Sequence, residues 1–387
     1  MFFQQNKSLS SLSDWWIKLN KDIHSDWLST QPPEYDSSVV FSDEFNSIGE
    51  ERSRFSNMES PDSAIIKVHS QSMINIDESS QMPSDDTIIE PKHLLTLQIT
   101  QRKICLFEVS TSEQEQSRRD FRSEHIPGAR LLFYSSLSHN GVPVHPLQFQ
   151  RYARSLGIDN DCRVILYDRG QQIWASYAFW IFQLYGHTKI SLLNGGFEEW
   201  RRANQFNHNS TSVVNEQIYH IVRGVSTYSD RTGNFRAYWN TELISTFDDV
   251  LATFEARSGG VTDTNPEIID AQTMEEYSGK ARELIETRDN NVIFGHIRGA
   301  INIPIERLYD VTTNRWNTDK QILALIRDEN ALTDLQRPLI VYDGTSLRAS
   351  MVWLALKRHG YAHVSIYFGS WPEWIIRAPD YLKVIPT

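Results

Sequence analysis

Beyond about residue 88, short apolar runs alternate with stretches of helical periodicity. The runs are five or six residues long and rich in β-branched residues: ICLFEV (104–109), RVILYD (163–168), ISLLN (190–194), EIIDA (267–271), PLIVYD (338–343) and VSIYF (364–368). Two longer stretches, 174–187 and 347–361, repeat apolar residues at helical spacing. Strand-length runs that alternate with helices predict an α/β fold with a largely parallel sheet.

Three short motifs occur twice in the same order, 171 to 175 residues apart. They are HIPGA (125–129) with HIRGA (296–300), Tyr167-Asp168 with Tyr342-Asp343, and GGFEEW (195–200) with GSWPEW (369–374). A repeat at a nearly constant offset predicts a duplication of one α/β unit of ordinary domain size.

These patterns divide the chain into four parts. We expect an extension at 1–87, a first domain at 88–206, a linker at 207–234 and a second domain at 235–387. The linker is polar and turn-rich. Residues 1–90 contain 19 serines, and a segment with so little apolar surface is expected to be largely disordered.

The extension also carries tryptophans at helical spacing. Trp15, Trp16 and Trp27 lie near Ser13, which could serve as an N-cap. Two interpretations stay open at this point. One is a transient helix in a disordered tail, and the other is a helix that docks on a partner or on the body of the chain.

The net charge of −11 comes mostly from the extension. Residues 1–90 hold 16 acidic and 6 basic side chains, whereas the rest of the chain holds 33 and 32. Because no basic excess exists to neutralise phosphates, general nucleic-acid binding is disfavoured. No run of about 18 apolar residues occurs, so no membrane span is expected.

The two cysteines, Cys105 and Cys162, are too few for a disulfide scaffold or a Cys-rich zinc site. This cysteine usage favours a reducing compartment. The first residues lack the basic start and long apolar stretch of a secretory signal. We therefore expect a cytoplasmic protein, with a mitochondrial location as the alternative, and we expect neither a metal nor a cofactor.

The repeated motifs carry a resemblance to a known family. In the first half they are EHIPGA (124–129), YDRG (167–170) with Ala175-Ser176, and GGFEEW (195–200). In the second half they are Asp270-Ala271, GHIRGA (295–300) with Asn302-Ile303-Pro304, YDG (342–344) with Ala349-Ser350, and GSWPEW (369–374). Each half resembles a rhodanese domain, and the pair is similar to the tandem-rhodanese sulfurtransferases, which include thiosulfate and 3-mercaptopyruvate sulfurtransferases.

This resemblance covers about residues 88–385. It implies two rhodanese-like domains, each a mainly parallel sheet flanked by helices. It also implies a cysteine in the second domain, at the start of a loop whose backbone N–H groups stabilise a thiolate or persulfide. That thiolate takes sulfur from a donor and passes it to an acceptor.

In this chain the resemblance places Asp343 at the cysteine position. The rest of the corresponding loop is Gly344, Thr345, Ser346, Leu347 and Arg348. A carboxylate cannot form a persulfide. Ser346 stands where the family has a glycine, so the loop is expected to be strained or reshaped. Asp168 occupies the same place in the first half, which the resemblance implies is non-catalytic.

The resemblance also implies two arginines that bind the anionic donor. Gln272 and Glu276 stand at their positions here. The loss of two cations, together with the carboxylates of Glu276 and Asp343, is expected to repel thiosulfate or mercaptopyruvate. Arg348 either draws a small anion to the loop or pairs with Asp343.

Neither cysteine is a good replacement nucleophile. Cys105 lies inside an apolar run and is interpreted as a buried core thiol. Cys162 precedes a strand, whereas ligands of open α/β sheets bind at the carboxyl ends of strands. His125 and His296 are expected to make structural hydrogen bonds, and Trp200 and Trp374 to pack in the core.

Three hypotheses for the function follow. We favour a family member that lacks persulfide sulfur transfer and acts as a binding or regulatory pseudoenzyme, through a protein partner at the extension or at the inactive loop. The alternative is an active sulfurtransferase that moves sulfur from thiosulfate or 3-mercaptopyruvate to a thiophilic acceptor with a non-standard nucleophile. The third is a purely structural role, with the acidic extension as an interaction element.

Overall fold

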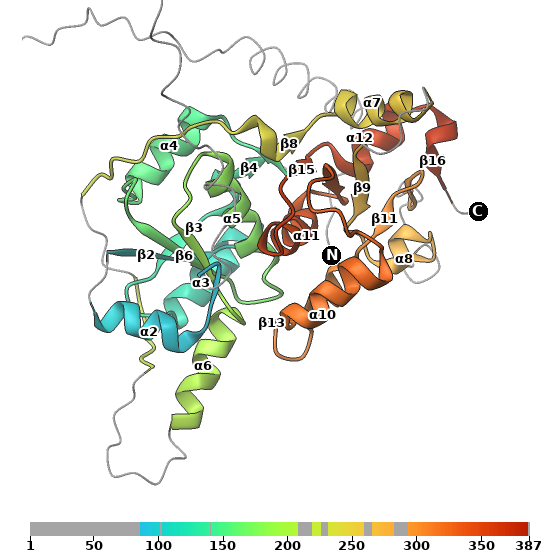
Figure 1. Cartoon of the computed structure of the whole chain (residues 1–387). Coiled ribbons are helices and arrows are strands. Elements are labelled where there is room, and N and C mark those ends of the chain that lie inside the picture. Colours follow the sequence, from blue (N-terminus) through green and yellow to red (C-terminus); the bar gives the residue numbers. More distant parts are fainter. Residues whose placement is uncertain are drawn as a thin grey trace, which may run out of the picture. The chain divides into compact units, whose positions relative to one another are not determined.

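The apolar runs of each half form a five-stranded sheet in which every pair of neighbouring strands is parallel (Figure 1). The order in the first sheet is β1 (Ile88–Ile89), β7 (Ile190–Leu193), β6 (Arg163–Tyr167), β2 (Ile104–Val109) and β3 (Arg130–Leu132). In the second sheet it is β8 (Ile244–Ser245), β15 (Val364–Tyr367), β14 (Leu339–Tyr342), β9 (Glu267–Asp270) and β11 (Ile301–Asn302). The two orders correspond strand by strand, so the predicted duplication is confirmed.

This computed structural model describes residues 86–100, 103–139, 141–207, 219–225, 231–258, 265–281 and 293–385. The predicted helix around Trp15, and with it nearly all of the extension, lies outside these residues. So does most of the predicted linker. Both halves belong to one unit, Ser80–Thr387, and are therefore described together. Within the described residues, no helix combines the length and apolar character needed to cross a membrane.

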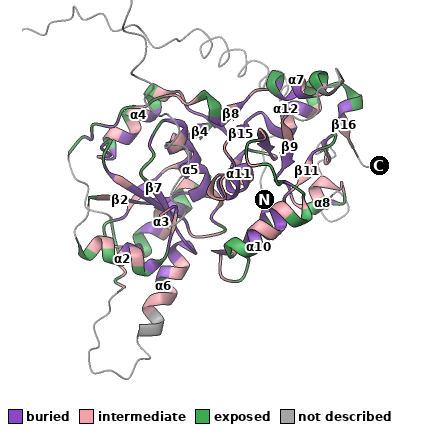
Figure 2. Ribbon diagram, viewed as in Figure 1, coloured by how far each residue is buried: buried purple, intermediate pink, exposed green. Residues whose placement is uncertain are grey.

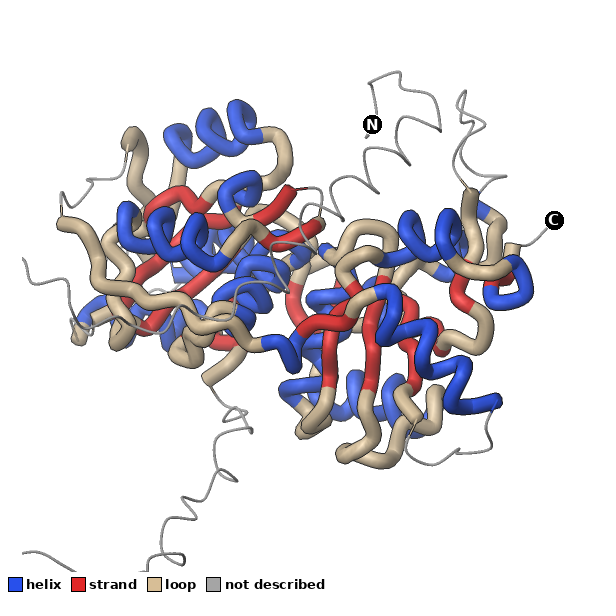
Figure 3. Tube along the Cα trace, turned by 90° about the horizontal axis from the view of Figure 1, so that it is seen from above, coloured by secondary structure: helices blue, strands red, loops and turns tan. Residues whose placement is uncertain are grey.

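Helices flank the strands in each half (Figure 3). Those of the first half are α2 (Pro91–Ile99), α3 (Gln114–Ser123), α4 (Pro146–Ser155), α5 (Ile173–Leu184) and α6 (Gly196–Asn207). Those of the second are α7 (Phe247–Ser258), α8 (Met274–Tyr277), α10 (Asp319–Leu323), α11 (Leu347–Arg358) and α12 (Ser370–Arg377). Local sequence sets several of their starts: proline occupies the first turn of α2 and α4, and capping boxes begin α8 and α10.

The helices α5 and α11 join the two halves. Most of their residues are buried on every face (Figure 2), as expected for a helix that lies inside a protein rather than on its surface. The two helices pack against each other, and the ring centroids of Phe179 and Trp353 lie 6.5 Å apart. One hydrophobic core therefore runs through both domains.

A short hairpin from each half reaches the other half. At the hairpin of β4 (Ser138–His139) and β5 (Val142–Pro143), Gly141 packs against the backbone of Thr345 in the second half. From the hairpin of β12 (Tyr309–Asp310) and β13 (Arg315–Trp316), the backbone N–H of Trp316 donates to Asn194 Oδ1 at 2.9 Å. Each hairpin thus contacts a loop at the carboxyl end of the other sheet.

The prediction of a free core thiol at Cys105 is wrong, because Cys105 forms a disulfide with Cys162. Cys105 is in β2 and Cys162 directly precedes β6. Since these neighbouring strands are parallel, both cysteines lie at the same edge of the sheet, with their Cα atoms 6.2 Å apart. That separation is ordinary for a disulfide. The pairing also removes the basis for inferring a reducing compartment.

We predict that Gly141→Ala lowers the free energy of unfolding by about 1–3 kcal/mol. A Cβ at Gly141 would lie 2.1 Å from the carbonyl oxygen of Thr345, and the φ angle of +88° also disfavours a side chain. Chemical denaturation measures the change. The control is Gly170→Ala, where an added Cβ would meet no atom within 4 Å. Equal losses in the two variants would contradict the close contact between the halves.

Candidate functional site: an aspartate in a loop of backbone donors

The candidate loop begins where the central strand of the second sheet ends. Asp343 directly follows β14, and α11 begins at Leu347. Ser346, just before the helix, has a φ of 66°. Its hydroxyl donates to the carbonyl of Phe368 at 3.0 Å and is fully buried. The left-handed turn that favours glycine is thus kept with serine, at a conformational cost.

The carboxylate of Asp343 takes up the backbone donors of this loop. It is fully buried, and its Oδ1 accepts hydrogen bonds from the N–H groups of Thr345, at 3.1 Å, and Ser346. Its Oδ2 accepts from the N–H of Arg348 at 3.1 Å. Successive N–H groups at the start of a helix form an anion-binding site. Here the anion is a side chain of the loop itself.

The first half repeats this arrangement. Asp168 directly follows β6 and is buried. Its Oδ1 accepts from the N–H groups of Gly170 at 3.0 Å and Gln172 at 3.3 Å, and its Oδ2 accepts from Ala175 at 3.1 Å. Gln172 has a φ of 65° and precedes α5, as Ser346 precedes α11. The two loops therefore have the same design, although the first is one residue longer.

Arg348 joins the loop to α8. Its Nε lies 3.4 Å from Asp343 Oδ2, and its Nη1 lies 2.5 Å from Glu276 Oε2. Of the two expectations for Arg348, pairing with Asp343 is the one found. The bridge to Glu276 was not predicted, because residues 72 positions apart in the sequence give no local signal of contact.

Charge in this cluster is partly balanced. Burial raises the pKa of Asp343, against the opposing effects of Arg348 and the backbone donors. Burial would also raise the pKa of Glu276, but Arg348 and Thr273 hold it below its ordinary value. Both carboxylates hold the pKa of Arg348 above its usual range, despite burial. With one arginine beside two carboxylates, the expected repulsion of an anionic sulfur donor is reduced but not removed.

Gln272 lies in a separate buried network. Its Nε2 donates to Asp270 Oδ2 and to the carbonyl of Gly295, both at 3.0 Å. Tyr342 also donates to the Asp270 carboxyl group. Burial raises the pKa of Asp270 to about 7. An ion pair with Arg348 thus joins Glu276 to the candidate loop, whereas the Gln272 side chain donates its hydrogen bonds to Asp270 and Gly295.

The motif histidines make hydrogen bonds to the backbone, and the motif tryptophans pack in the core, as predicted. Nδ1 of His125 lies 2.8 Å from the carbonyl of Phe121, and Nδ1 of His296 lies 2.8 Å from that of Tyr277. Trp200 and Trp374 are buried in the cores of their domains; neither is more than 1% exposed. Across the part of the chain that the structure describes, no group of three or more His, Cys, Asp or Glu side chains is placed to hold a metal ion.

Comparison with known families agrees with this architecture. The model of the rhodanese-like domain matches residues 91–203 and again residues 255–377. The chain belongs to the rhodanese-like family. That Asp343 stands at the position of the family's cysteine, and Gln272 and Glu276 at those of its arginines, stays a prediction from the motifs.

The similar proteins span both halves. Thiosulfate sulfurtransferase of Rattus norvegicus is 27% identical over 278 residues, covering 70% of this chain and 83% of the rat protein. 3-Mercaptopyruvate sulfurtransferase of Mus musculus is 30% identical over 276 residues, covering 69% and 82%. Among solved structures, the sulfur transferase subunit of yeast mitochondrial complex I superposes with a TM-score of 0.63 at 21% identity, covering 78% of this chain and all of the subunit.

We predict that Glu276→Gln lowers the free energy of unfolding at neutral pH by about 1.5–3 kcal/mol, the typical contribution of a hydrogen bond to a charged group. The amide still completes the capping box with Thr273, so the change isolates the charge that faces Arg348. Urea denaturation across a range of pH measures the effect.

The sign of the pH dependence follows from the lowered pKa of Glu276. The folded-state pKa lies below the ordinary value of 4.5, so the contribution is present above that value and is lost as pH falls through the folded-state pKa. The difference between the two proteins should therefore shrink toward zero at low pH. Exposed Glu275→Gln is the control; a constant difference down to low pH would contradict the ion pair.

Proposed function

We propose that this protein is a member of the thiosulfate and 3-mercaptopyruvate sulfurtransferase family that does not transfer sulfur through a persulfide. It instead acts as a binding or regulatory protein. The observation that carries the proposal is the carboxylate of Asp343, which accepts the backbone N–H groups of Thr345, Ser346 and Arg348.

Persulfide chemistry needs a nucleophilic sulfur and a site for the sulfur anion. By its loop motif, Asp343 stands where the family has its nucleophilic cysteine. Its carboxylate also accepts the backbone hydrogen bonds that would otherwise stabilise the sulfur anion. A donor such as thiosulfate would have to displace a buried carboxylate that is tied to the same polypeptide. Such a displacement would leave Arg348 and the loop donors to be satisfied by the substrate alone.

The two cysteines do not offer a substitute. The sequence contains only Cys105 and Cys162, and these are bonded to each other. They lie where β2 and β6 begin, at the opposite edge of the sheet from Asp168, which follows the end of β6. In open α/β sheets, ligands bind at the carboxyl ends of strands. A nucleophilic thiolate next to either candidate loop is therefore absent from this chain.

A binding role fits a protein that retains the rhodanese-like fold and its loop but has no nucleophilic cysteine in that loop. The yeast protein that superposes on this chain is a sub-stoichiometric subunit of mitochondrial complex I. We propose by analogy that this chain also acts by associating with another protein, through residues 1–87 or the surface around the candidate loop. Fold alone does not determine such a role. Experiments that measure binding to a partner protein are therefore needed to test it.

The direct test is sulfur uptake by the full-length protein. After incubation with thiosulfate or with 3-mercaptopyruvate, the intact mass should not increase by one sulfur atom, and no turnover to cyanide or a thiol acceptor should exceed the enzyme-free blank. Turnover that persists in the Cys105→Ser, Cys162→Ser double variant would contradict the proposal, because it would demonstrate a nucleophile other than cysteine.

A companion experiment asks whether the loop still suits a sulfur anion. We predict that Asp343→Cys combined with Gln272→Arg and Glu276→Arg takes up one sulfur atom from thiosulfate, because the loop N–H groups are then free to stabilise a persulfide. The matched control carries the two arginines and keeps Asp343. Uptake by neither variant would contradict the inference that the loop retains an anion-binding geometry.

A further inference from the structure

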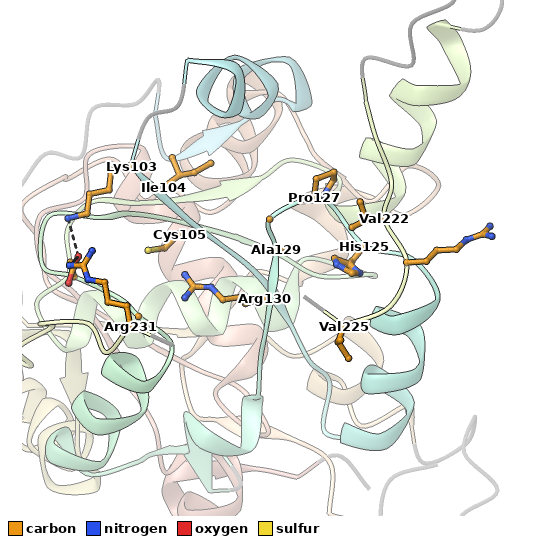
Figure 4. Close-up of a pocket in the computed structure, with 14 residues that line it drawn as sticks. Lys103, Ile104, Cys105, His125, Pro127, Ala129, Arg130, Val222, Val225 and Arg231 are labelled. Atoms are coloured by element: carbon orange, nitrogen blue, oxygen red, sulfur yellow. Dashed lines mark hydrogen bonds and ion pairs between the residues drawn. The ribbon is translucent and has the colours of Figure 1, made fainter. Parts of the chain in front are cut away.

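The first domain contains a cavity of about 460 Å³ at the edge of the sheet opposite its candidate loop (Figure 4). Its wall is built from the start of β2, from β3 and its preceding turn, and from described residues that follow α4 and α6. The lining side chains that matter chemically are Lys103, Cys105, Arg130, Asp159, Arg223 and Arg231. Its volume is typical of sites that bind small molecules.

Positive charge dominates the lining. Four side chains of the wall are cationic, namely Lys103, Arg130, Arg223 and Arg231, whereas only one carboxylate, Asp159, lines it. Two carboxylates just outside the lining also pair with these cations: Asp161 lies 2.6 Å from Lys103, and Glu124 lies 3.6 Å from Arg223, so the cations still outnumber the carboxylates by one. His125 also lines the cavity, but burial lowers its pKa and favours its neutral form. A concave wall with an excess of one charge concentrates ligands of the opposite charge. The cavity is thus suited to a small anion.

The same wall contains the disulfide. Cys105 lines the cavity and retains 6% exposure, whereas Cys162 is fully buried and does not line it. Figure 4 shows the Cys105 side chain between those of Lys103 and Arg130. Cys105 is therefore the member of the pair that faces the cavity, and Cys162 is the natural leaving group when a ligand attacks from there.

We propose that this cavity is a binding site for a small anionic thiol, which opens the Cys105–Cys162 disulfide by exchange. The thiolate of the ligand attacks the sulfur of Cys105, a new sulfur–sulfur bond forms there, and the electron pair of the broken bond leaves on Cys162 as a thiolate, which takes up a proton. A second molecule of the same thiol then attacks the ligand sulfur as its thiolate; Cys105 leaves as a thiolate and takes up a proton, and the two ligand molecules are released as a symmetric disulfide.

The surrounding cations give the site its selectivity. Thiol–disulfide exchange passes through a negatively charged arrangement of three sulfurs, so nearby cations favour both the bound anion and the reaction. Asp159 holds Arg231 at 2.7 Å and Lys103 at 3.1 Å, which keeps two of these cations at the wall. A thiol with no further negative group shares the effect on the reaction but gains no attraction in binding, and charge thus distinguishes the proposed ligand from other reductants.

The experiment uses the full-length, oxidised protein and reduced glutathione as the probe. Its first measurement is the number of free thiols after denaturation without a reductant, which the proposal requires to be zero. The second is the rate of opening by glutathione and by neutral 2-mercaptoethanol, each expressed per thiolate. We expect glutathione to be about three- to ten-fold faster at low salt, with the advantage lost at high salt.

Peptide mapping of the mixed disulfide locates the attacked sulfur, which should be Cys105. The double variant Arg223→Gln, Arg231→Gln should abolish most of the advantage of glutathione. The control, Arg201→Gln with Arg307→Gln, removes two arginines that are likewise exposed and ion-paired but lie outside the cavity. It should react like the unmodified protein.

Three results would overturn the proposal. They are free thiols in the purified protein, equal rates for the anionic and neutral thiols, and an adduct on Cys162 in place of Cys105. The comparison of the two thiols needs no substitution, so it tests the proposed site even if a variant fails to fold.

Discussion

The hydrogen bonds from the loop N–H groups to the carboxylate of Asp343 are the interaction on which the account of this protein depends. A parallel strand that ends at the start of a helix gathers backbone donors that need an acceptor. Asp343 supplies that acceptor from within the chain, and Arg348 connects it to Glu276 on α8. Backbone donors that could bind an external anion are thereby satisfied by a side chain of the same loop.

An aspartate that accepts the backbone N–H groups of its own loop occurs in both halves of the duplication. Asp168 satisfies the equivalent donors in the first domain, and both loops lead into the helices, α5 and α11, that form the shared core. The hairpins then contact loops of the opposite halves, as Gly141 does at Thr345. The two candidate sites and the interface between domains are therefore one connected structure.

Much of the fold could be predicted from the sequence, because strand-length apolar runs and repeated motifs are local signals. The buried strands lie where the runs predicted them, and each aspartate directly follows its strand. The disulfide was missed because the second cysteine lies 57 residues beyond the first. Only the parallel pairing of 104–109 with 163–168 brings Cys105 and Cys162 together, and that strand order was not predicted from the sequence.

The site itself was only partly predictable. Motifs placed Asp343, Glu276 and Gln272 near one another in the fold, but the directions of their side chains depend on contacts made after folding. Glu276 turns toward Arg348, whereas Gln272 turns toward Asp270. The pairing of Arg348 with Asp343 was one of two expectations from the sequence, whereas its second ion pair, with Glu276, depends on a contact between residues far apart in the chain.

Whether Asp343 fills the anion site can be tested by following the loop amides themselves by NMR during a titration with thiosulfate. If the carboxylate of Asp343 already fills the anion site, the N–H resonances of Thr345, Ser346 and Arg348 will stay unchanged up to high thiosulfate concentration. Saturable shifts confined to these three amides would contradict the account, because they would show that an external anion reaches donors assigned here to the side chain of Asp343.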